Sequence, residues 1–182
     1  MVVINTFLDT VFFSKESSDI DFINIAYAFR HKKLYESAER AYRMAILKNE
    51  ATGRITSTSL TIYVGLFRVY DIQNKTKDAL RILLDGYQKT REEDEGLLYL
   101  LGYYYIDKKI DVKKGIEILK SVLNEKHKFS GYLSEPSDEI LSKVATGYWE
   151  LKNKKQTMLF VNKALELNPK NETALKLKAS IE

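Results

Sequence analysis

Apolar residues recur along this chain at the spacing of one face of an α-helix, and the segment 137–169 shows this most clearly. One apolar stripe ends at Tyr148 and a second begins at Met158, with polar residues at 152–155 between them. Pro169 follows the second stripe, and a proline cannot continue a helix because it lacks a backbone N–H and its ring clashes with the preceding turn. The pattern predicts two antiparallel helices joined by a short turn.

The same pattern fits three earlier parts of the chain. Its reference position, in the middle of each first helix, is occupied by Ala26, Phe67, Gly102 and Ala145, which lie 41, 35 and 43 residues apart. Taken together, the matched positions resemble the tetratricopeptide repeat (TPR), a helix pair of about 34 residues with small and aromatic residues at fixed places. The matched positions are Phe22, Ile25, Ala26, Phe29, Ala38, Tyr42 and Ala45; Tyr63, Leu66, Phe67, Tyr70, Ala79, Leu83 and Gly86; Leu98, Leu101, Gly102, Tyr105, Gly115, Leu119 and Val122; and Leu141, Val144, Ala145, Tyr148, Thr157, Val161, Ala164 and Pro169.

The resemblance implies an all-α fold, a right-handed α-α superhelix (TPR-like solenoid) of about four helix pairs with a capping helix at each end. The last copy departs from the family pattern at Thr157 and Val161, where the family has Ala and an aromatic residue. We expect one TPR-like domain over residues 1–182, and we expect the segment 124–136 to be a loop, a lid or an extension of the preceding helix. The expected parts are an N-terminal helix or cap at 1–18, repeats at 19–50, 57–91, 93–124 and 137–169, and a C-terminal capping helix at 171–182.

The N-terminal segment has an apolar face of its own. Apolar residues from Ile4 to Phe12 follow the i, i+3, i+4, i+7, i+8 spacing, which predicts a short amphipathic helix over 5–14. We expect this helix to cover the open end of the first repeat. The alternative is a second interface formed by Phe7, Phe12 and Phe13, which faces a partner or a second copy of the chain in a homodimer. The reason is that three aromatic rings are more apolar surface than a capping helix needs.

Composition and charge narrow the classes of function. The 182 residues are 45% hydrophobic and 30% charged, which is typical of a globular protein, and the absence of cysteine excludes disulfides and thiolate metal sites. The net charge is +4, and all of the excess lies among scattered lysines in the last 32 residues, so we expect a solvated helix face and no nucleic-acid partner. No apolar run is long enough to span a bilayer, and we expect a soluble protein of the cytoplasm.

The chain offers little material for catalysis. It has two histidines, His31 and His127, and both lie beside lysines rather than beside carboxylates. The acidic run at 92–95 lacks the alternating ligands and the central glycine of a calcium loop, and the glycines do not form a phosphate-binding loop. We therefore expect that the protein is not an enzyme and that it holds no cofactor or metal.

Surface residues are the remaining candidates for function. In a solenoid of helix pairs, the first helix of each pair lines the concave side, and its non-core residues point into a groove. This rule predicts a groove in which Tyr and Trp rings supply buried area while Arg30, Arg68 and Lys143 orient acidic groups through charge-assisted hydrogen bonds. We expect the partner to be a protein or peptide with acidic and apolar side chains. The predicted groove residues are Asn24, Tyr27, Arg30, Arg68, Tyr99, Tyr103, Lys143 and Trp149.

The leading hypothesis is a non-catalytic interaction module, an adaptor that binds a peptide or partner protein in this groove. The resemblance does not extend to the TPR proteins that grip the carboxylate tail of heat-shock chaperones with Lys and Asn, because the matching positions include Ile23, Gly65 and Leu100. Two alternatives are the ligand-sensing TPR domain of a bacterial peptide-responsive regulator and a structural subunit that dimerises through its N-terminal helix.

Overall fold

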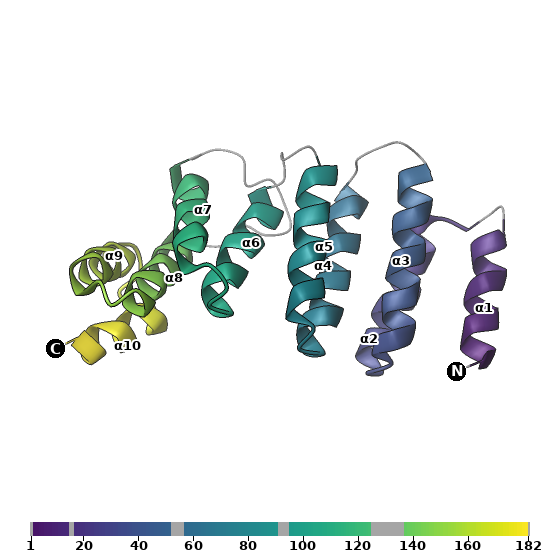
Figure 1. Cartoon of the computed structure of the whole chain (residues 1–182), viewed down its shortest axis with the longest axis horizontal. Coiled ribbons are helices and arrows are strands. Elements are labelled where there is room, and N and C mark those ends of the chain that lie inside the picture. Colours follow the sequence, from purple (N-terminus) through teal and green to yellow (C-terminus); the bar gives the residue numbers. More distant parts are fainter. Residues whose placement is uncertain (1, 15–16, 52–56, 91–94, 125–136, 182) are drawn as a thin grey trace. The chain divides into compact units, whose positions relative to one another are not determined.

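A computed structural model describes residues 2–14, 17–51, 57–90, 95–124 and 137–181 of the chain, and within these ranges it contains ten α-helices and no strand (Figure 1). The helices are α1 (Val2–Phe13), α2 (Asp19–His31), α3 (Tyr35–Ala51), α4 (Ser57–Ile72), α5 (Thr76–Lys89), α6 (Glu95–Asp107), α7 (Val112–Asn124), α8 (Ser137–Glu150), α9 (Lys154–Leu167) and α10 (Glu172–Ile181). The prediction of an all-helical fold built from four helix pairs is confirmed.

The helices belong to two compact units. Unit 1 (Met1–Asp94) holds α1 to α5, and unit 2 (Glu95–Glu182) holds α6 to α10. The assignment of residues 1–182 to a single domain stays a prediction. The prediction for the segment 124–136 lies outside the described residues, apart from Asn124 at the end of α7.

The four helix pairs share one turn geometry. Lys33, Asn74, Lys109 and Lys152 each follow a first helix and have positive φ angles of 59°, 56°, 53° and 58°. At each turn two backbone N–H groups donate to the last turn of the first helix at 2.9–3.1 Å, in the Schellman pattern that satisfies the final carbonyls. These four residues are spaced 41, 35 and 43 apart, as are the matched positions of the repeats, so the register predicted from the sequence is confirmed.

Small residues let neighbouring helices approach closely, both between pairs and within a pair. In unit 1 a Cβ added at Gly65 of α4 would lie 2.4 Å from the ring of Tyr42 on α3, and in unit 2 a Cβ at Gly115 of α7 would lie 2.8 Å from the backbone oxygen of Gly102 on α6. A side chain at either position would force its neighbour to move, because real Cβ contacts are essentially never shorter than about 3.0 Å. Most of the matched repeat positions are buried, including Phe22 in unit 1.

A carboxylate closes the first and the last helix pair in the same way. Asn49, at the end of α3, donates its amide to Asp19 at the start of α2 (2.8 Å). Asn168, which follows α9, donates to Asp138 at the start of α8 (2.8 Å), and Asn171 adds a second bond of 2.9 Å. In both pairs the aspartate lies 30 residues before the asparagine, so the second helix is anchored to the beginning of the first.

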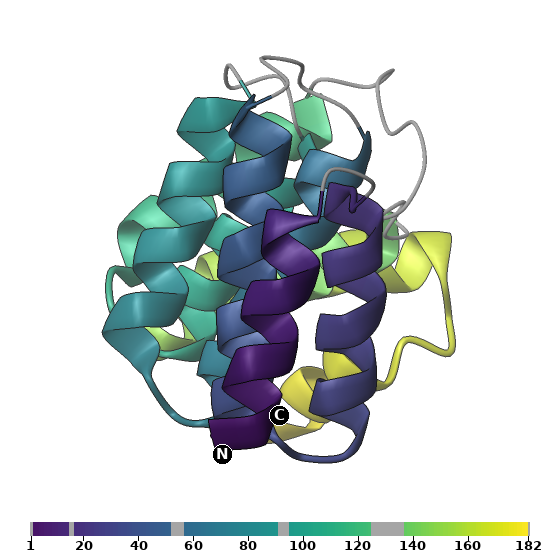
Figure 2. The same ribbon diagram turned by 90° about the vertical axis from the view of Figure 1, so that its right-hand side faces the viewer.

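The terminal helices lie against the repeats of their own units. In unit 1 Leu8 of α1 is fully buried, and Phe12 packs against the ring of Phe22 on α2 with centroids 5.9 Å apart. Asp9 pairs with Arg40 of α3, and Figure 2 shows α1 (dark purple) beside α2 and α3. In unit 2 α10 contacts α8 and α9 and buries Ala174, as expected for a C-terminal helix that covers the last repeat.

Candidate functional site

The first helices of the two repeats in unit 1, α2 and α4, contact each other and carry four of the predicted groove residues. Asn24, Tyr27 and Arg68 are exposed, and Arg30 is half-buried. Tyr27 keeps 52% of its surface accessible, although it is a large aromatic residue in a helix that packs on two others. We name the surface formed by Asn24, Tyr27, Arg30 and Arg68 the α2/α4 face.

Neighbours on its own helix surround the ring of Tyr27. The guanidinium carbon of Arg30 lies 5.3 Å from the centre of this ring, and the imidazole of His31 lies 4.3 Å from it, centre to centre. A cation over an aromatic face is attracted by the ring quadrupole, so the ring and the guanidinium restrict each other's motion. The exposed ring is therefore partly ordered before any partner arrives, which lowers the entropic cost of burying it.

Both arginines of the face act electrostatically on the hydroxyl of Tyr42. Tyr42 belongs to α3 and is buried, with its ring against Gly65 of α4. Burial raises the pKa of Tyr42, while the positive charges of Arg30 and Arg68 act in the opposite direction and Tyr27 adds to the rise. The charges of Arg30 on α2 and of Arg68 on α4 therefore both act on one buried phenol of unit 1.

Arg30 and Arg68 differ from the other described arginines in lacking a carboxylate partner. Arg40 pairs with Asp9, Arg43 with Glu39 and Arg81 with Asp78. Among the described residues, no carboxylate lies within ion-pairing distance of Arg30 or Arg68. A guanidinium presents its donors in a planar fork that matches a carboxylate or phosphate, so this face can accept an anion without breaking an internal ion pair.

The predicted groove residues of unit 2 are arranged differently. The ammonium of Lys143 lies 3.6 Å from the ring centre of Tyr103 and 2.9 Å from Oδ1 of Asp107, and only 11% of its side chain is exposed. Lys143 is therefore engaged by two groups of the chain itself, and its role toward a partner stays a prediction. Tyr103 remains exposed, and Trp149, on the same helix as Lys143, is half-buried.

Tyr99 is a correction to the predicted groove. It is 6% exposed and belongs to the hydrophobic core of unit 2, together with residues of α7, α8 and α9. Nearly every residue of α6 is apolar, so the helix has no polar face that marks the solvent side. The sequence rule placed Tyr99 on the exposed side, whereas its ring in fact packs toward the core.

The predicted second interface is divided between surface and interior. Phe7 is exposed on α1, but Phe12 packs against Phe22 and lies 5.1 Å below the ammonium of Lys48. The side chain of Phe13 lies outside the described residues. Phe7 and Phe12 therefore differ in exposure, and the exposed large apolar residues in the described part of α1 are Val3 and Phe7.

Unit 1 has a second surface feature, on the side of its second helices, that the sequence rules did not predict. A hollow of about 520 Å³ lies between α3 and α5. Ile46, Leu47 and Ile82 supply its apolar part, and its remaining lining residues are Arg43, Tyr70, Arg81 and Asp85. The i,i+4 pair Glu39 and Arg43 and the i,i+3 pair Asp78 and Arg81 were the available sequence signals, and both are ordinary helix-surface patterns.

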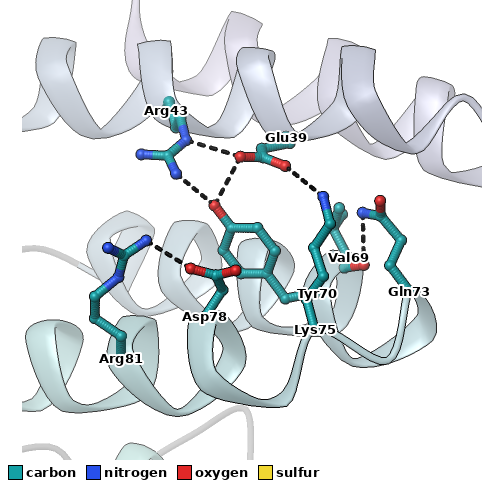
Figure 3. A network of polar contacts seen from close by, with 8 residues as sticks. All are labelled: Glu39, Arg43, Val69, Tyr70, Gln73, Lys75, Asp78 and Arg81. Atoms are coloured by element: carbon teal, nitrogen blue, oxygen red, sulfur yellow. Dashed lines mark hydrogen bonds and ion pairs between the residues drawn. The ribbon is translucent and has the colours of Figure 1, made fainter.

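The polar groups beside this hollow are satisfied by one another, as Figure 3 shows. The hydroxyl of Tyr70 donates to Glu39 (2.9 Å) and accepts from Arg43 (2.6 Å), and Arg43 also donates to Glu39 (3.1 Å). The second oxygen of Glu39 lies 3.5 Å from the ammonium of Lys75. Burial and the contact with Glu39 raise the pKa of Tyr70 to about 12. The network joins α3 to α4 and to the turn before α5, and its one carboxylate, Glu39, is shared by two cations, Arg43 and Lys75.

The described ranges of the chain contain no group of three or more His, Asp or Glu residues that could hold a metal ion. No helix in those ranges is long and apolar enough to cross a membrane.

The fold is similar to those of solved TPR structures. YrrB, described as a TPR protein with an unusual peptide-binding site, superposes with a TM-score of 0.67 at 14% identity, over 91% of this chain and 76% of YrrB. A tetratricopeptide repeat protein from Parabacteroides merdae gives 0.72 at 20% identity, over 90% of this chain and 59% of that protein. MamA gives 0.66 at 16% identity, over 90% of this chain and 80% of MamA. No protein-family profile matches the chain, and no curated protein matches it in sequence.

Proposed function

The chain is a TPR-like helical repeat protein, and we propose that it is a non-catalytic protein-interaction module whose partner binds on the α2/α4 face of unit 1. The observation that carries this proposal is that Arg30 and Arg68 have no carboxylate partner among the described residues, whereas Arg40, Arg43 and Arg81 each have one. A guanidinium without a carboxylate partner among the described residues can make bidentate hydrogen bonds to an acidic group from outside.

The chemistry of the face specifies the kind of partner. Its two guanidinium groups can bind carboxylates of a partner. The exposed ring of Tyr27 and the exposed side chain of Ile72, at the end of α4, can pack against apolar residues of that partner. Tyr and Arg are the residue types that supply most of the binding energy at protein interfaces. We therefore assign to this face an acidic peptide segment that also carries large apolar side chains. The peptide-binding site named for YrrB supports a peptide as a ligand for this fold.

The proposal is tested with two fluorescein-labelled peptides. In the first, Glu alternates with Leu and Phe, and in the second Gln replaces every Glu while the apolar residues stay. Binding is followed by fluorescence anisotropy with the full chain, with Arg30→Gln and Arg68→Gln, and with Arg81→Gln as the matched control. Arg81 is exposed and belongs to the same unit, but it is paired with Asp78 and lies on α5.

We expect the chain to prefer the Glu peptide, and each substitution on the face to weaken this binding by about tenfold or more, because a charge-assisted hydrogen bond is lost. The control is expected to bind like the unchanged chain. Equal binding of the Glu and Gln peptides, or equal losses in Arg30→Gln and Arg81→Gln, would contradict the assignment of the face.

A further inference from the structure

Unit 2 has a basic edge where the turns between first and second helices lie side by side. The turn between α6 and α7 and the turn between α8 and α9 are joined by an ion pair of 2.7 Å between Lys109 and Glu150. We define the turn edge of unit 2 as residues 107–114 and 150–156, which run in each case from the last residue of the first helix into the first turn of the second.

Lysines dominate this edge, with seven of them against three carboxylates. Each of the three carboxylates is already engaged. Asp107 pairs with Lys143 and Lys108, Glu150 pairs with Lys109, and Asp111 accepts a hydrogen bond from the backbone at the start of α7. The lysines that are exposed and have no carboxylate partner among the described residues are Lys113, Lys114, Lys152, Lys154 and Lys155.

The corresponding edge of unit 1 is an internal comparison. Residues 31–37 and 72–78 occupy the same places in the first two helix pairs, and they contain four lysines against two carboxylates. The second helices α3 and α5 there have Glu36 and Asp78 in their first turns. Both edges carry an excess of positive charge, but it is four charges in unit 2 and two in unit 1, so the larger excess of unit 2 is not required by the turn geometry that all four pairs share.

The lysines of unit 2 also occupy positions that disfavour positive charge. The first turns of α7 and α9 contain no acidic residue, and each contains two adjacent lysines. The amino end of a helix carries partial positive charge, so cations there oppose the helix dipole. Sequences break such local rules mainly where function requires it, so this placement indicates that the charges serve a purpose other than folding.

Exposed aliphatic side chains lie among these lysines. Ile110 is 42% exposed in the first turn of the edge, and Leu151 is 39% exposed in the second. A phosphate surface alone would be matched by lysines without apolar neighbours. Lysines around exposed aliphatic residues instead match the boundary of an anionic bilayer, where ammonium groups meet the headgroups and apolar side chains reach the acyl region.

Residues 95–182 contain no arginine, and this favours a lipid surface over a nucleic acid as the ligand of the edge. Nucleic-acid interfaces rely on arginine for bidentate and stacking contacts, whereas a lysine ammonium acts as a point charge that suits mobile headgroups. We propose that the turn edge of unit 2 is a docking surface for an anionic phospholipid bilayer, which the protein contacts peripherally through its exposed lysines, Ile110 and Leu151.

The test is co-sedimentation of the full chain with vesicles of phosphatidylcholine alone and of phosphatidylcholine mixed with phosphatidylserine. The charge variant is Lys152→Glu, Lys154→Glu and Lys155→Glu. Its matched control is Lys32→Glu, Lys33→Glu and Lys77→Glu on the edge of unit 1, where all three lysines are exposed and the charge change is the same. Circular dichroism establishes that both variants retain their helices, and the charge variant is expected to fold well because glutamate suits the first turn of α9.

We expect binding to the mixed vesicles only, and this binding should weaken as salt is raised. Each lysine near an anionic surface is worth roughly a fivefold change in the partition coefficient, so the loss of three lysines costs about a hundredfold. Because each Lys→Glu also adds a negative charge, the charge variant should lose at least that much, and the control much less. The proposal is overturned if the two variants lose binding equally or if the unchanged chain does not bind the mixed vesicles.

A second variant distinguishes a bilayer from other polyanions. Ile110→Gln with Leu151→Gln keeps every charge and is expected to weaken vesicle binding by about tenfold, because it removes the side chains that reach the acyl region. A single-stranded RNA serves as the competing ligand. Tight RNA binding that the double variant does not affect, with no binding to vesicles, would replace the lipid assignment with a nucleic-acid one. Arg30→Gln with Arg68→Gln should bind vesicles like the unchanged chain, so this test and that of the α2/α4 face fail separately.

Discussion

Replacement of Gly65 by alanine tests the packing that underlies the α2/α4 face. An added Cβ would lie 2.4 Å from ring carbons Cε1 and Cζ of Tyr42 and 2.6 Å from its hydroxyl oxygen. The ring must therefore retreat by about 0.6 Å to reach even the shortest contact that real Cβ atoms make. Tyr42 is buried among α2, α3 and α4, so this movement shifts its neighbours.

Two effects of opposite sign determine how much Gly65→Ala changes the free energy of unfolding. Overpacking of a buried site costs about 1–3 kcal/mol, whereas alanine in place of glycine inside a helix gains about 1 kcal/mol. We expect a net destabilisation of about 1 kcal/mol in the unchanged chain. Tyr42→Leu removes the three atoms that the new Cβ meets, and in that background Gly65→Ala should stabilise by about 1 kcal/mol.

The assay is urea unfolding followed by circular dichroism for the four chains of this double-mutant cycle. The expected coupling between the two sites is about 2 kcal/mol, and its sign is set by the overlap with the ring. If Gly65→Ala stabilised the chain equally in both backgrounds, the close contact between α3 and α4 would be absent and the reasoning refuted.

Three further predictions concern the helix ends. Lys154→Glu and Lys155→Glu should each raise the free energy of unfolding by about 0.3–1 kcal/mol, measured by thermal denaturation, because each reverses a charge that opposes the dipole of α9; a lower melting temperature would contradict this. Hydrogen bonds from its asparagine partners lower the pKa of Asp138 below its ordinary 3.8, so its stabilising contribution is present above that pH and is lost as the pH falls through the folded-state value. Urea unfolding should therefore show a deficit for Asp138→Asn at about pH 7 that shrinks near about pH 2.5, and a deficit independent of pH would refute it. Lys33→Gly should stabilise by up to about 1 kcal/mol because its φ is 59°, whereas Lys32→Gly, with an ordinary φ, should not; equal urea midpoints for the two would contradict the turn geometry.

The helix pairs could be predicted from the sequence because their signal is local and repeated. Small and aromatic residues recur with correlated spacing, and their burial follows from that spacing, as for Ala26 and Tyr70. The N-terminal helix was also predicted, although it begins at Val2, a few residues earlier than the pattern indicated. The positive φ at Lys33, Lys109 and Lys152 had no signal, because lysine is not a residue that favours that conformation.

The candidate site could be predicted only where a helix has a clear polar face. Asn24, Tyr27 and Arg68 are exposed, as the repeat rule requires, because α2 and α4 alternate between apolar and polar positions. Tyr99 was assigned wrongly because α6 is apolar on nearly every side. The engagement of Lys143 depends on Asp107, which lies 36 residues away, and spacing within one helix contains no information about such a pair.

The most direct test of the central claim is an NMR titration that observes the Nε–H groups of the arginine side chains while the Glu peptide is added to the full chain. The account predicts that the signals of Arg30 and Arg68 shift in proportion to binding, that those of Arg43 and Arg81 remain in place because their carboxylate partners are inside the chain, and that the Gln peptide moves none of them. Shifts of Arg43 and Arg81 with Arg30 and Arg68 unmoved would contradict it and would place the partner at the hollow between α3 and α5.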